Sequence, residues 1–199
     1  KHKLLEYVKG DDLIDLEEKL DKSDFLIHLA GENRTQNLND FKLNNIDLTK
    51  NICKTIQKIK KEIPIIFTSS IQVFNNSPYG KSKKEAENIL YELYVKSNNP
   101  IKIYRLPGVF GKWCKPQYNS VVSTFCYLIS RNKEITISDP KKKIKLIFID
   151  DLVDELYNSI SSTINSFSFE RVDPIYELTL GELAKNLKKF YKSRAELTI

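Results

Sequence analysis

Short apolar runs alternate with longer amphipathic segments along this chain, and no other feature constrains its fold as strongly. Buried strands of a parallel sheet are continuous apolar runs, whereas covering helices repeat apolar residues every three or four positions. The strand-helix-strand-helix order therefore predicts an α/β fold, a doubly wound parallel sheet with helices on its faces. We expect strands at 4–8, 25–30, 65–68, 101–106, near 135 and at 144–149, and helices at 13–20, 40–61, 79–95, 120–130, 151–161 and 181–192.

Size and composition are those of a well-packed globular domain. The chain has 199 residues, of which 41% are hydrophobic and 29% charged, and these values exclude disordered and fibrous proteins. No run approaches the roughly 18 apolar residues that span a bilayer, and the first residues lack the apolar stretch of a signal peptide. We therefore predict a cytoplasmic protein that does not bind membranes.

Cysteine content and charge exclude further classes. Three widely spaced cysteines indicate reduced thiols, and two histidines without a Cys-x-x-Cys motif predict no metal site. The net charge of +6 does not indicate nucleic acid, because the lysines are spread among almost as many acids. The dense lysine clusters at 58–61 and 141–145 fit a helix C-terminus and a strand flank, which are solvated surfaces. A small phosphate-bearing ligand is compatible with this charge.

The most informative local motif is a tyrosine followed four residues later by a lysine, Tyr79 and Lys83. By itself such a pair is commonly an exposed helix pair, but on one helix the Lys83 ammonium is expected beside the Tyr79 hydroxyl. A free tyrosine has a pKa near ~10, and a neighbouring cation is expected to lower it. Ser70, after an apolar run, is placed to share the proton or bind the reacting oxygen. The three groups suit hydride transfer to or from a carbonyl, in which an alkoxide is protonated as it forms.

Residues after the first predicted strands suggest where a cofactor binds. Ala30 and Gly31 form a tight strand-end turn, which a cofactor would need for close approach. Lys9 follows the strand at 4–8, where NADP-binding sheets often present a cation to the 2′-phosphate. Asp11 and Asp12 would instead suit the ribose hydroxyls of NAD. These residues alone leave NADP and NAD equally open.

Other polar residues have structural as well as functional readings. His28, inside a predicted strand, is expected to be a buried histidine with one nitrogen satisfied. Asn45, taken by itself, is read as a solvated helix residue. Asp150 and Asp151 are expected to cap a helix N-terminus.

With these residues placed, the chain resembles the extended short-chain dehydrogenase/reductases, the NAD-dependent epimerase/dehydratase superfamily that acts on nucleotide sugars. The resemblance implies a Rossmann-like sheet and rests on the joint order of several motifs. These are the segments His28–Gly31, Asn44–Ile46, Thr68–Phe74, Tyr79–Lys83, Arg105–Gly111 and Phe148–Val153.

A narrower resemblance, strongest over Gly111–Cys126, is to the capsular-polysaccharide reductases of the UDP-N-acetyl-L-fucosamine pathway. It implies NADPH-dependent reduction of the 4-keto group of a UDP-2-acetamido-2,6-dideoxy-hexulose, with the protein acting as a homodimer. The implied partner is thus a UDP-deoxy-amino-sugar, and the cofactor is NADP(H), with NAD possible on the residues alone.

The resemblance also implies roles for individual residues. Tyr79 would protonate the nascent C4 alkoxide, Lys83 would lower the Tyr79 pKa and hold a cofactor ribose, and Ser70 would bond the carbonyl oxygen. Asn45, for which the resemblance implies either a backbone-stabilising or a proton-relay role, completes the expected catalytic set. The expected cofactor-binding residues are Lys9, Leu29, Ala30, Gly31, Tyr79, Lys83, Leu106 and Pro107, and the expected substrate-binding residues are Arg34, Ser70, Gln72, Lys112, Trp113, Lys115 and Asn119.

Two departures from the family pattern lead us to expect a fragment. The Gly-x-x-Gly-x-x-Gly turn that wraps the cofactor pyrophosphate has no match, so roughly one βα unit of about 25 to 30 residues is expected to be missing before Lys1. The family's C-terminal zinc-containing cupin domain has no counterpart either. We expect a single truncated domain, with residues to about 110 mainly binding cofactor. The part from about 111 to 199 is expected mainly to bind substrate, with core strands interleaved.

Alternatives to the reductase remain. One is a nucleotide-sugar epimerase with tightly bound NAD, and another is a catalytically silent sugar-nucleotide-binding protein, which the absent glycine-rich turn favours. Dehydratases commonly have paired acids after the active-site serine position, and Ile71 and Gln72 offer none, which argues against elimination chemistry.

Overall fold

The structure of the chain, a computed structural model, describes residues 2–162 and 164–196, with side chains as far as residue 193. The chain divides into two compact units. The first comprises the residues up to 105 together with 156–171, and the second comprises 106–155 together with the residues from 172 onward. The division of roles between cofactor-binding and substrate-binding parts stays a prediction.

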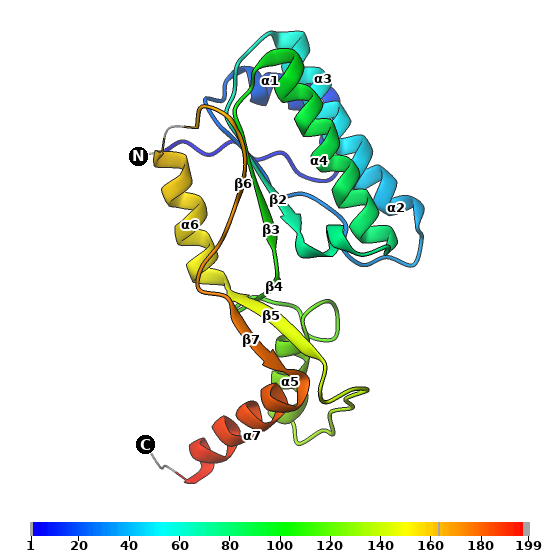
Figure 1. Cartoon of the computed structure of the whole chain (residues 1–199), viewed down its shortest axis with the longest axis vertical. Helices are drawn as coiled ribbons and strands as arrows, with labels where there is room; N and C mark the ends of the chain where they lie inside the picture. The colour runs from blue at the N-terminus through cyan, green and yellow to red at the C-terminus, as the bar shows by residue number, and fades with distance from the viewer. Residues whose placement is uncertain (1, 163, 197–199) are drawn as a thin grey trace. The chain divides into compact units, whose positions relative to one another are not determined.

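The first unit is built on a sheet of four strands in the order β1-β2-β3-β6, in which β1–β2 and β3–β6 pair in parallel (Figure 1). Its elements confirm the predicted α/β fold. The strands are β1 (Leu26–His28), β2 (Ile65–Ser70), β3 (Ile101–Leu106) and β6 (Phe167–Glu170), and the helices are α1 (Leu13–Asp21), α2 (Asn39–Phe41), the π-helix η1 (Lys42–Asp47), α3 (Leu48–Ile59), the 3₁₀-helix η2 (Ile71–Phe74) and α4 (Pro78–Ser97).

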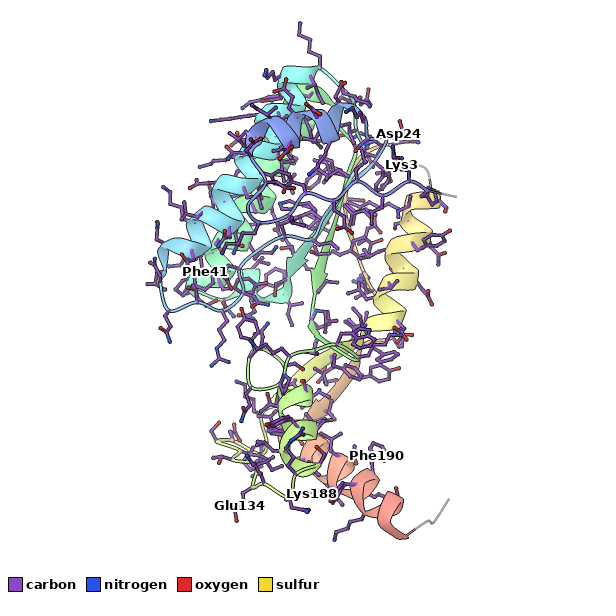
Figure 2. All side chains as sticks on the ribbon, turned by 180° about the vertical axis from the view of Figure 1, so that it is seen from behind. Lys3, Asp24, Phe41, Glu134, Lys188 and Phe190 are labelled. Carbon is purple, nitrogen blue, oxygen red and sulfur yellow. The ribbon has the colours of Figure 1, made fainter. Side chains whose placement is uncertain are left out.

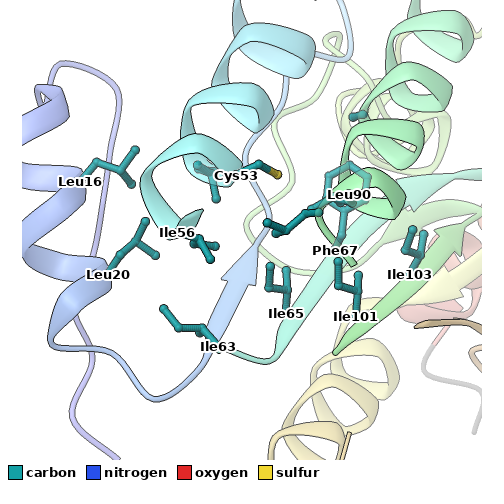
Figure 3. Close-up of a cluster of buried hydrophobic side chains, with 13 residues drawn as sticks. Leu16, Leu20, Cys53, Ile56, Ile63, Ile65, Phe67, Leu90, Ile101 and Ile103 are labelled. Carbon is teal, nitrogen blue, oxygen red and sulfur yellow. The ribbon is translucent and has the colours of Figure 1, made fainter. Parts of the chain in front are cut away.

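One face of this sheet packs on α1, α3 and α4 to form the main hydrophobic core (Figure 3). Alternate residues of β2 and β3, such as Ile65 and Ile103, point into it, because side chains of a strand alternate between its faces. Tyr104 and Lys102 point to the other face, where their side chains hydrogen-bond Ser159 of α6 (Ile149–Ser161). Helices therefore cover both faces, as a doubly wound sheet requires.

The predicted helix at 40–61 forms a continuous run of α2, η1 and α3, with one π-helical stretch in its first half. Such a stretch locally widens the helix and frequently marks a functional site. Here it contains Asn45, whose side chain is 2% exposed. The run ends at Lys60, which adopts the left-handed conformation common at helix C-termini.

Helix α4 begins and ends with strong capping signals. The Ser77 hydroxyl accepts a hydrogen bond from the Gly80 N–H at 3.0 Å, and Pro78 occupies the first helical position. Asn98 closes the helix in the left-handed conformation. These caps set the helical register of every functional side chain on α4.

The second unit has a three-stranded sheet, β4-β5-β7, with β4–β5 parallel and β5–β7 antiparallel. Its own core lies between two helices, where Phe125 packs against Leu183 and Ala184. Lys188 and Phe190 project from the last helix into solvent (Figure 2). The elements are β4 (Gly108–Phe110), α5 (Val121–Ile129), β5 (Lys143–Phe148), β7 (Tyr176–Thr179) and α7 (Leu180–Glu196).

Three local predictions fail for identifiable reasons, and three short strands have no counterpart among the predictions. Residues 4–8 form no strand, because no neighbouring strand in the described chain pairs with them, and Leu4 and Val8 are exposed. Ile135 forms no strand either; its side chain packs against the core of the second unit without backbone pairing. Asp150 and Asp151 lie in the first turn of α6 and are not its N-cap. Strands β4, β6 and β7 are too short for their apolar pattern to identify them.

None of the helices in the described residues is both long and apolar enough to span a bilayer.

The core of the first unit makes a direct stability prediction. Leu90 of α4 is 0% exposed, so Leu90→Ala is expected to lower the free energy of unfolding by about 2–5 kcal/mol, measured by urea denaturation. Val95, which is 65% exposed on the same helix, is the control, and Val95→Ala is expected to change it by less than about 0.5 kcal/mol. If Leu90→Ala and Val95→Ala lowered the free energy of unfolding equally, the observed burial of Leu90 would be contradicted.

Candidate active site

Three functional side chains, Tyr79, Lys83 and Glu87, lie one turn apart on the buried face of α4. Lys83 is 4% and Glu87 2% exposed, whereas Tyr79 is partly buried, with its ring 6.1 Å from that of Phe41. The helical spacing read from the sequence thus brings an aromatic alcohol, a cation and an acid to one face.

A glycine inside the Tyr79 motif lets α4 approach the end of β2. A Cβ added at Gly80 would lie 2.1 Å from the carbonyl oxygen of Gln72, which is closer than any side chain allows. Gln72 belongs to η2, whose N-terminus is capped by Ser70, because the Ser70 hydroxyl accepts from the Gln72 N–H at 3.2 Å. The glycine therefore sets the distance between the Tyr79 helix and the Ser70 turn.

The electrostatics of Tyr79 differ from the prediction. Burial raises the pKa of the Tyr79 phenol, and a hydrogen-bonding contribution from Ser70 lowers it in part. The prediction that Lys83 lowers the Tyr79 pKa is wrong for this structure, because Lys83 is not among the groups that shift it and the net shift is upward. A phenol with a raised pKa keeps its proton at neutral pH, so Tyr79 carries a proton at its hydroxyl in this structure.

The Lys83 ammonium lies over the ring of Phe67, with Nζ 4.3 Å from the ring centroid. Burial lowers the pKa of Lys83 to about 8, and the Glu87 carboxylate partly opposes this shift. Within the described residues no hydrogen bond or ion pair to its Nζ is formed. The ammonium is also close to Gly31, since a Cβ added there would lie 3.4 Å from Nζ.

Asn45 clamps the turn that follows β1. Its Oδ1 accepts from the Glu32 N–H at 2.7 Å, and its Nδ2 donates to the Glu32 carbonyl at 2.9 Å and to the Ser82 hydroxyl at 2.8 Å. The Ser82 hydroxyl donates in turn to the Tyr79 carbonyl at 2.8 Å. Of the readings left open for Asn45, these bonds favour stabilisation of the backbone.

His28 is buried, as expected, and one of its ring nitrogens has a hydrogen-bond partner. Its Nε2 lies 3.0 Å from the hydroxyl of Thr49, which itself donates to the Asn45 carbonyl at 2.7 Å. Burial, and then the nearby Lys83 charge, lower the pKa of His28 to about 3, so its ring is neutral at physiological pH.

A buried ionic network lies beneath the Ser70 turn. The Glu87 carboxylate accepts two hydrogen bonds from Arg105, at 2.9 and 2.7 Å, and a third from the Ser69 hydroxyl at 2.7 Å. Arg105 also lies over the rings of Phe74 and Phe169. Despite burial, these bonds hold the pKa of Glu87 below its ordinary value. The network joins α4 to the ends of β2 and β3.

A cavity of about 420 Å³ opens beside the β1 turn in the first unit. Three of the predicted cofactor-binding residues, Lys9, Ala30 and Gly31, line it, and Leu29 does not. Gly31 thus lies between the cavity and the Lys83 ammonium. The other lining residues are Tyr7, Val8, Gly10, Asp11, Glu32, Leu43, Asn44, Asp47, Leu48 and Asn51.

Two acids that would suit a ribose are already engaged. The Asp11 carboxylate forms an ion pair with Lys19 at 2.7 Å and accepts from the Val8 N–H, and these bonds lower its pKa. Asp12 caps α1 by accepting from the N–H groups of residues 14 and 15. Lys9, whose side chain forms no hydrogen bond or ion pair within the described residues, is the lining cation.

Comparison with known proteins identifies the family. Residues 3–162 match the model of the NAD dependent epimerase/dehydratase family, which is more than half of the chain. The chain belongs to this family.

Two relatives are similar to this chain over nearly its whole length. The UDP-2-acetamido-2,6-beta-L-arabino-hexul-4-ose reductase of Pseudomonas aeruginosa is 39% identical over 183 residues, which are 92% of this chain and 49% of the relative. The crystal structure of the capsular polysaccharide assembling protein CapF from Staphylococcus aureus is 38% identical, with a TM-score of 0.79 over 94% of this chain and 50% of that one. The chain therefore spans about half the length of these relatives.

A more distant structure shows the shared fold. The UDP-glucuronic acid 4-epimerase of Bacillus cereus, in complex with UDP-glucuronic acid and NAD, has a TM-score of 0.83 at 20% identity. The similarity covers 92% of this chain and 64% of the epimerase chain.

The residues of the first unit fit the nicotinamide dinucleotide implied by the family name. A side chain at position 31 would fill the space between Asn45 and Lys83, since its Cβ would lie 2.8 Å from Asn45 Oδ1. Glycine leaves this space open, next to the cavity and next to a buried ammonium. These are the features that close approach of a ribose and phosphates needs.

The predicted site residues fall into two groups. Ser70, Tyr79, Lys83, Asn45 and Gly31 come together in the first unit around the ends of β1 and β2. Arg34 and Gln72 are exposed in the same unit. Leu106, Pro107, Lys112, Trp113, Lys115 and Asn119 belong to the second unit, where Lys112 pairs with Asp150 and Trp113 is 94% exposed, and their roles stay predictions.

Sequence reasoning missed Phe67, Gly80, Ser82 and Glu87. Glu87 had a detectable signal, since it continues the four-residue spacing of Tyr79 and Lys83. Gly80 and Ser82 lie inside the recognised motif, but their roles depend on contacts with residues that are not adjacent in the sequence.

Glu87→Gln is expected to lower the free energy of unfolding by about 3 kcal/mol at pH 7, because Arg105 then loses its charge partner. The folded-state pKa of Glu87 lies below its ordinary value of 4.5, so its contribution is fully present above pH 4.5 and is lost as the pH falls through the folded pKa. The difference in the free energy of unfolding between wild type and Glu87→Gln should therefore become smaller below about pH 4.5. Urea denaturation at a series of pH values measures it.

The control for this variant is Glu85→Gln, which changes an exposed acid on the same helix. If Glu85→Gln lowered the free energy of unfolding as much as Glu87→Gln, the stabilising ion pair of Glu87 would be contradicted. A difference between wild type and Glu87→Gln that stays constant down to acid pH would contradict it as well.

Proposed function

We propose that this protein is a nicotinamide-dependent reductase of a nucleotide sugar. The observation that carries the proposal is the placement of Tyr79 and Ser70 together at the end of β2, one helical turn from a buried lysine that lies near Gly31, a residue of the cavity wall. The 39% identity to a UDP-hexulose reductase supports reduction in particular.

Reduction of a ketone needs a proton at the carbonyl oxygen and a hydride at its carbon. A bound nicotinamide supplies the hydride. Ser70 donates a hydrogen bond to the carbonyl oxygen, and Tyr79 transfers its phenolic proton to that oxygen as the C–O double bond becomes an alcohol. The phenolate is then reprotonated from solvent. Lys83 would hold a cofactor ribose through its N–H donors, and Asn45 fixes the turn against which the cofactor would lie.

The finer proposal is a UDP-2-acetamido-2,6-dideoxy-hexulose 4-reductase in capsular or surface polysaccharide precursor synthesis. It rests on the relatives' names and on the resemblance over Gly111–Cys126. Arg34, Gln72, Lys112, Trp113, Lys115 and Asn119 are the proposed contacts to the sugar nucleotide, in a cytoplasmic homodimer.

For the cofactor we propose NADPH over NADH. Lys9 is the lining cation without a described partner, whereas Asp11 is engaged by Lys19 and Asp12 caps α1. A free cation favours a 2′-phosphate, and engaged acids offer little to a ribose diol.

Tyr79→Phe is expected to abolish oxidation of NADPH by the keto-sugar while cofactor affinity changes little, because only the proton donor is removed. Turnover is followed by absorbance at the nicotinamide band, and affinity by calorimetry. Unchanged turnover would remove Tyr79 from the mechanism. Turnover of a 4-epimer without net NADPH consumption would favour an epimerase, because an epimerase returns its hydride.

Lys9→Ala is expected to raise the KM for NADPH by about 10-fold or more and to leave that for NADH nearly unchanged, since only the 2′-phosphate loses a charge-assisted bond. Lys54→Ala, at an exposed position outside the cavity, is the control and should alter neither value. Equal changes with both cofactors would refute the NADPH preference.

A further inference from the structure

The charge on Lys83 has an unusual environment for a buried lysine. Its side chain is 4% exposed, and a buried ammonium is ordinarily stabilised by a carboxylate close by. The acid nearest in helical register is Glu87, one turn further along α4. Its carboxylate is committed to Arg105 and Ser69, and Lys84 approaches its second oxygen at 3.3 Å. Glu87 therefore acts on Lys83 only at a distance, through its charge.

An aromatic ring stands where a carboxylate would be expected. Phe67 of β2 is 1% exposed, and Lys83 Nζ lies 4.3 Å from its ring centroid, well within the range of a cation–π interaction. Such an interaction is stronger when both groups are desolvated, as they are here. The ring is itself braced by His28, whose ring centroid is 5.0 Å away and which is neutral.

An aromatic partner and a carboxylate differ in how many N–H donors of a lysine ammonium they leave free. A carboxylate accepts hydrogen bonds and occupies N–H donors, whereas a ring attracts the cation through its face. With Phe67 as the partner, the N–H groups of Lys83 stay available on the side of Gly31 and the cavity.

We propose that Phe67 is a positioning residue: its ring holds the Lys83 ammonium charged and directed toward the Gly31 turn, in place of a counter-ion, so that the ammonium can bind a ribose diol. The use made of the ammonium rests on the proposed function, but the role of the ring can be measured without it.

The titration of Lys83 tests the role directly. The titratable groups that face Lys83 are Glu87 of α4, whose charge acts on it, and His28 of β1, which is neutral at physiological pH, and Tyr79 lies one turn before it. The test uses NMR of the purified protein carrying ¹³C-labelled lysine, with the Lys83 signal assigned by its loss in Lys83→Met. In Phe67→Leu, loss of the ring is expected to lower the pKa of Lys83 by about one unit, since the ring favours the charged form.

Two comparisons separate the ring from the packing it provides. Ile65→Val removes a comparable volume from the same face of the same strand and should leave the Lys83 titration unchanged. Replacing Phe67 with phenylalanines bearing one, two and three fluorines keeps the shape and weakens the negative face of the ring stepwise. A graded fall in the Lys83 pKa is expected; a Lys83 pKa that does not respond to fluorination, or an equal shift in Ile65→Val, would overturn the proposal.

Cofactor binding tests the consequence. With the Lys83 pKa moved from about 8 to one unit lower, the charged fraction at pH 8 falls about fivefold. The Kd for NADPH in Phe67→Leu should therefore rise about fivefold at pH 8 and little at pH 6, with kcat at saturation less affected. The two proposals can fail separately. If fluorination of Phe67 lowers the Lys83 pKa while Tyr79→Phe leaves turnover intact, the positioning role of Phe67 stands and the proposed function fails. A Kd raised equally at both pH values would mean that the ring acts only structurally.

Discussion

The packing of α4 against the ends of β1 and β2 is the constraint on which the site depends. It buries an ammonium and a carboxylate on one helix face, and each must then be stabilised without water. Glu87 forms an ion pair with Arg105, and the Lys83 ammonium lies over the ring of Phe67. Gly80 makes the approach possible, because a side chain there would collide with the backbone of η2. Without this packing Tyr79 and Lys83 would be an ordinary exposed pair.

Hydrogen bonds also connect α4 to the turn after β1 and fix their relative position. Ser82 links the Tyr79 carbonyl to Asn45, and Asn45 holds both backbone groups of Glu32. The π-helical stretch η1 places Asn45 at this junction. Tyr79, the proposed proton donor, and the wall of the cavity are thereby parts of one connected structure, which is the preorganisation that the proposed reduction needs at its reacting oxygen.

Local pattern predicted most of the first unit because its elements carry strong signals. The helix at 78–97 has a capping serine, a proline and a polar stop, and β2 and β3 are continuous apolar runs. The segment at 4–8 has a strand-like composition too, yet it is not a strand, because a strand exists only with a paired neighbour. Short strands such as β6 have too few residues for their alternation to be recognised, and the division into two units follows from contacts between segments far apart in sequence.

The sequence by itself determined which chemical groups stand on one face of α4, because a four-residue spacing on a helix leaves no other arrangement. It also determined the family, through motifs in a set order. Only the tertiary structure decided which partner each group meets: the phenol of Tyr79 has its pKa raised by burial, and Lys83 faces Phe67. The reason is physical. Helical periodicity sets the direction in which a side chain leaves the backbone, whereas its charge state and contacts depend on strands and turns that are remote along the chain.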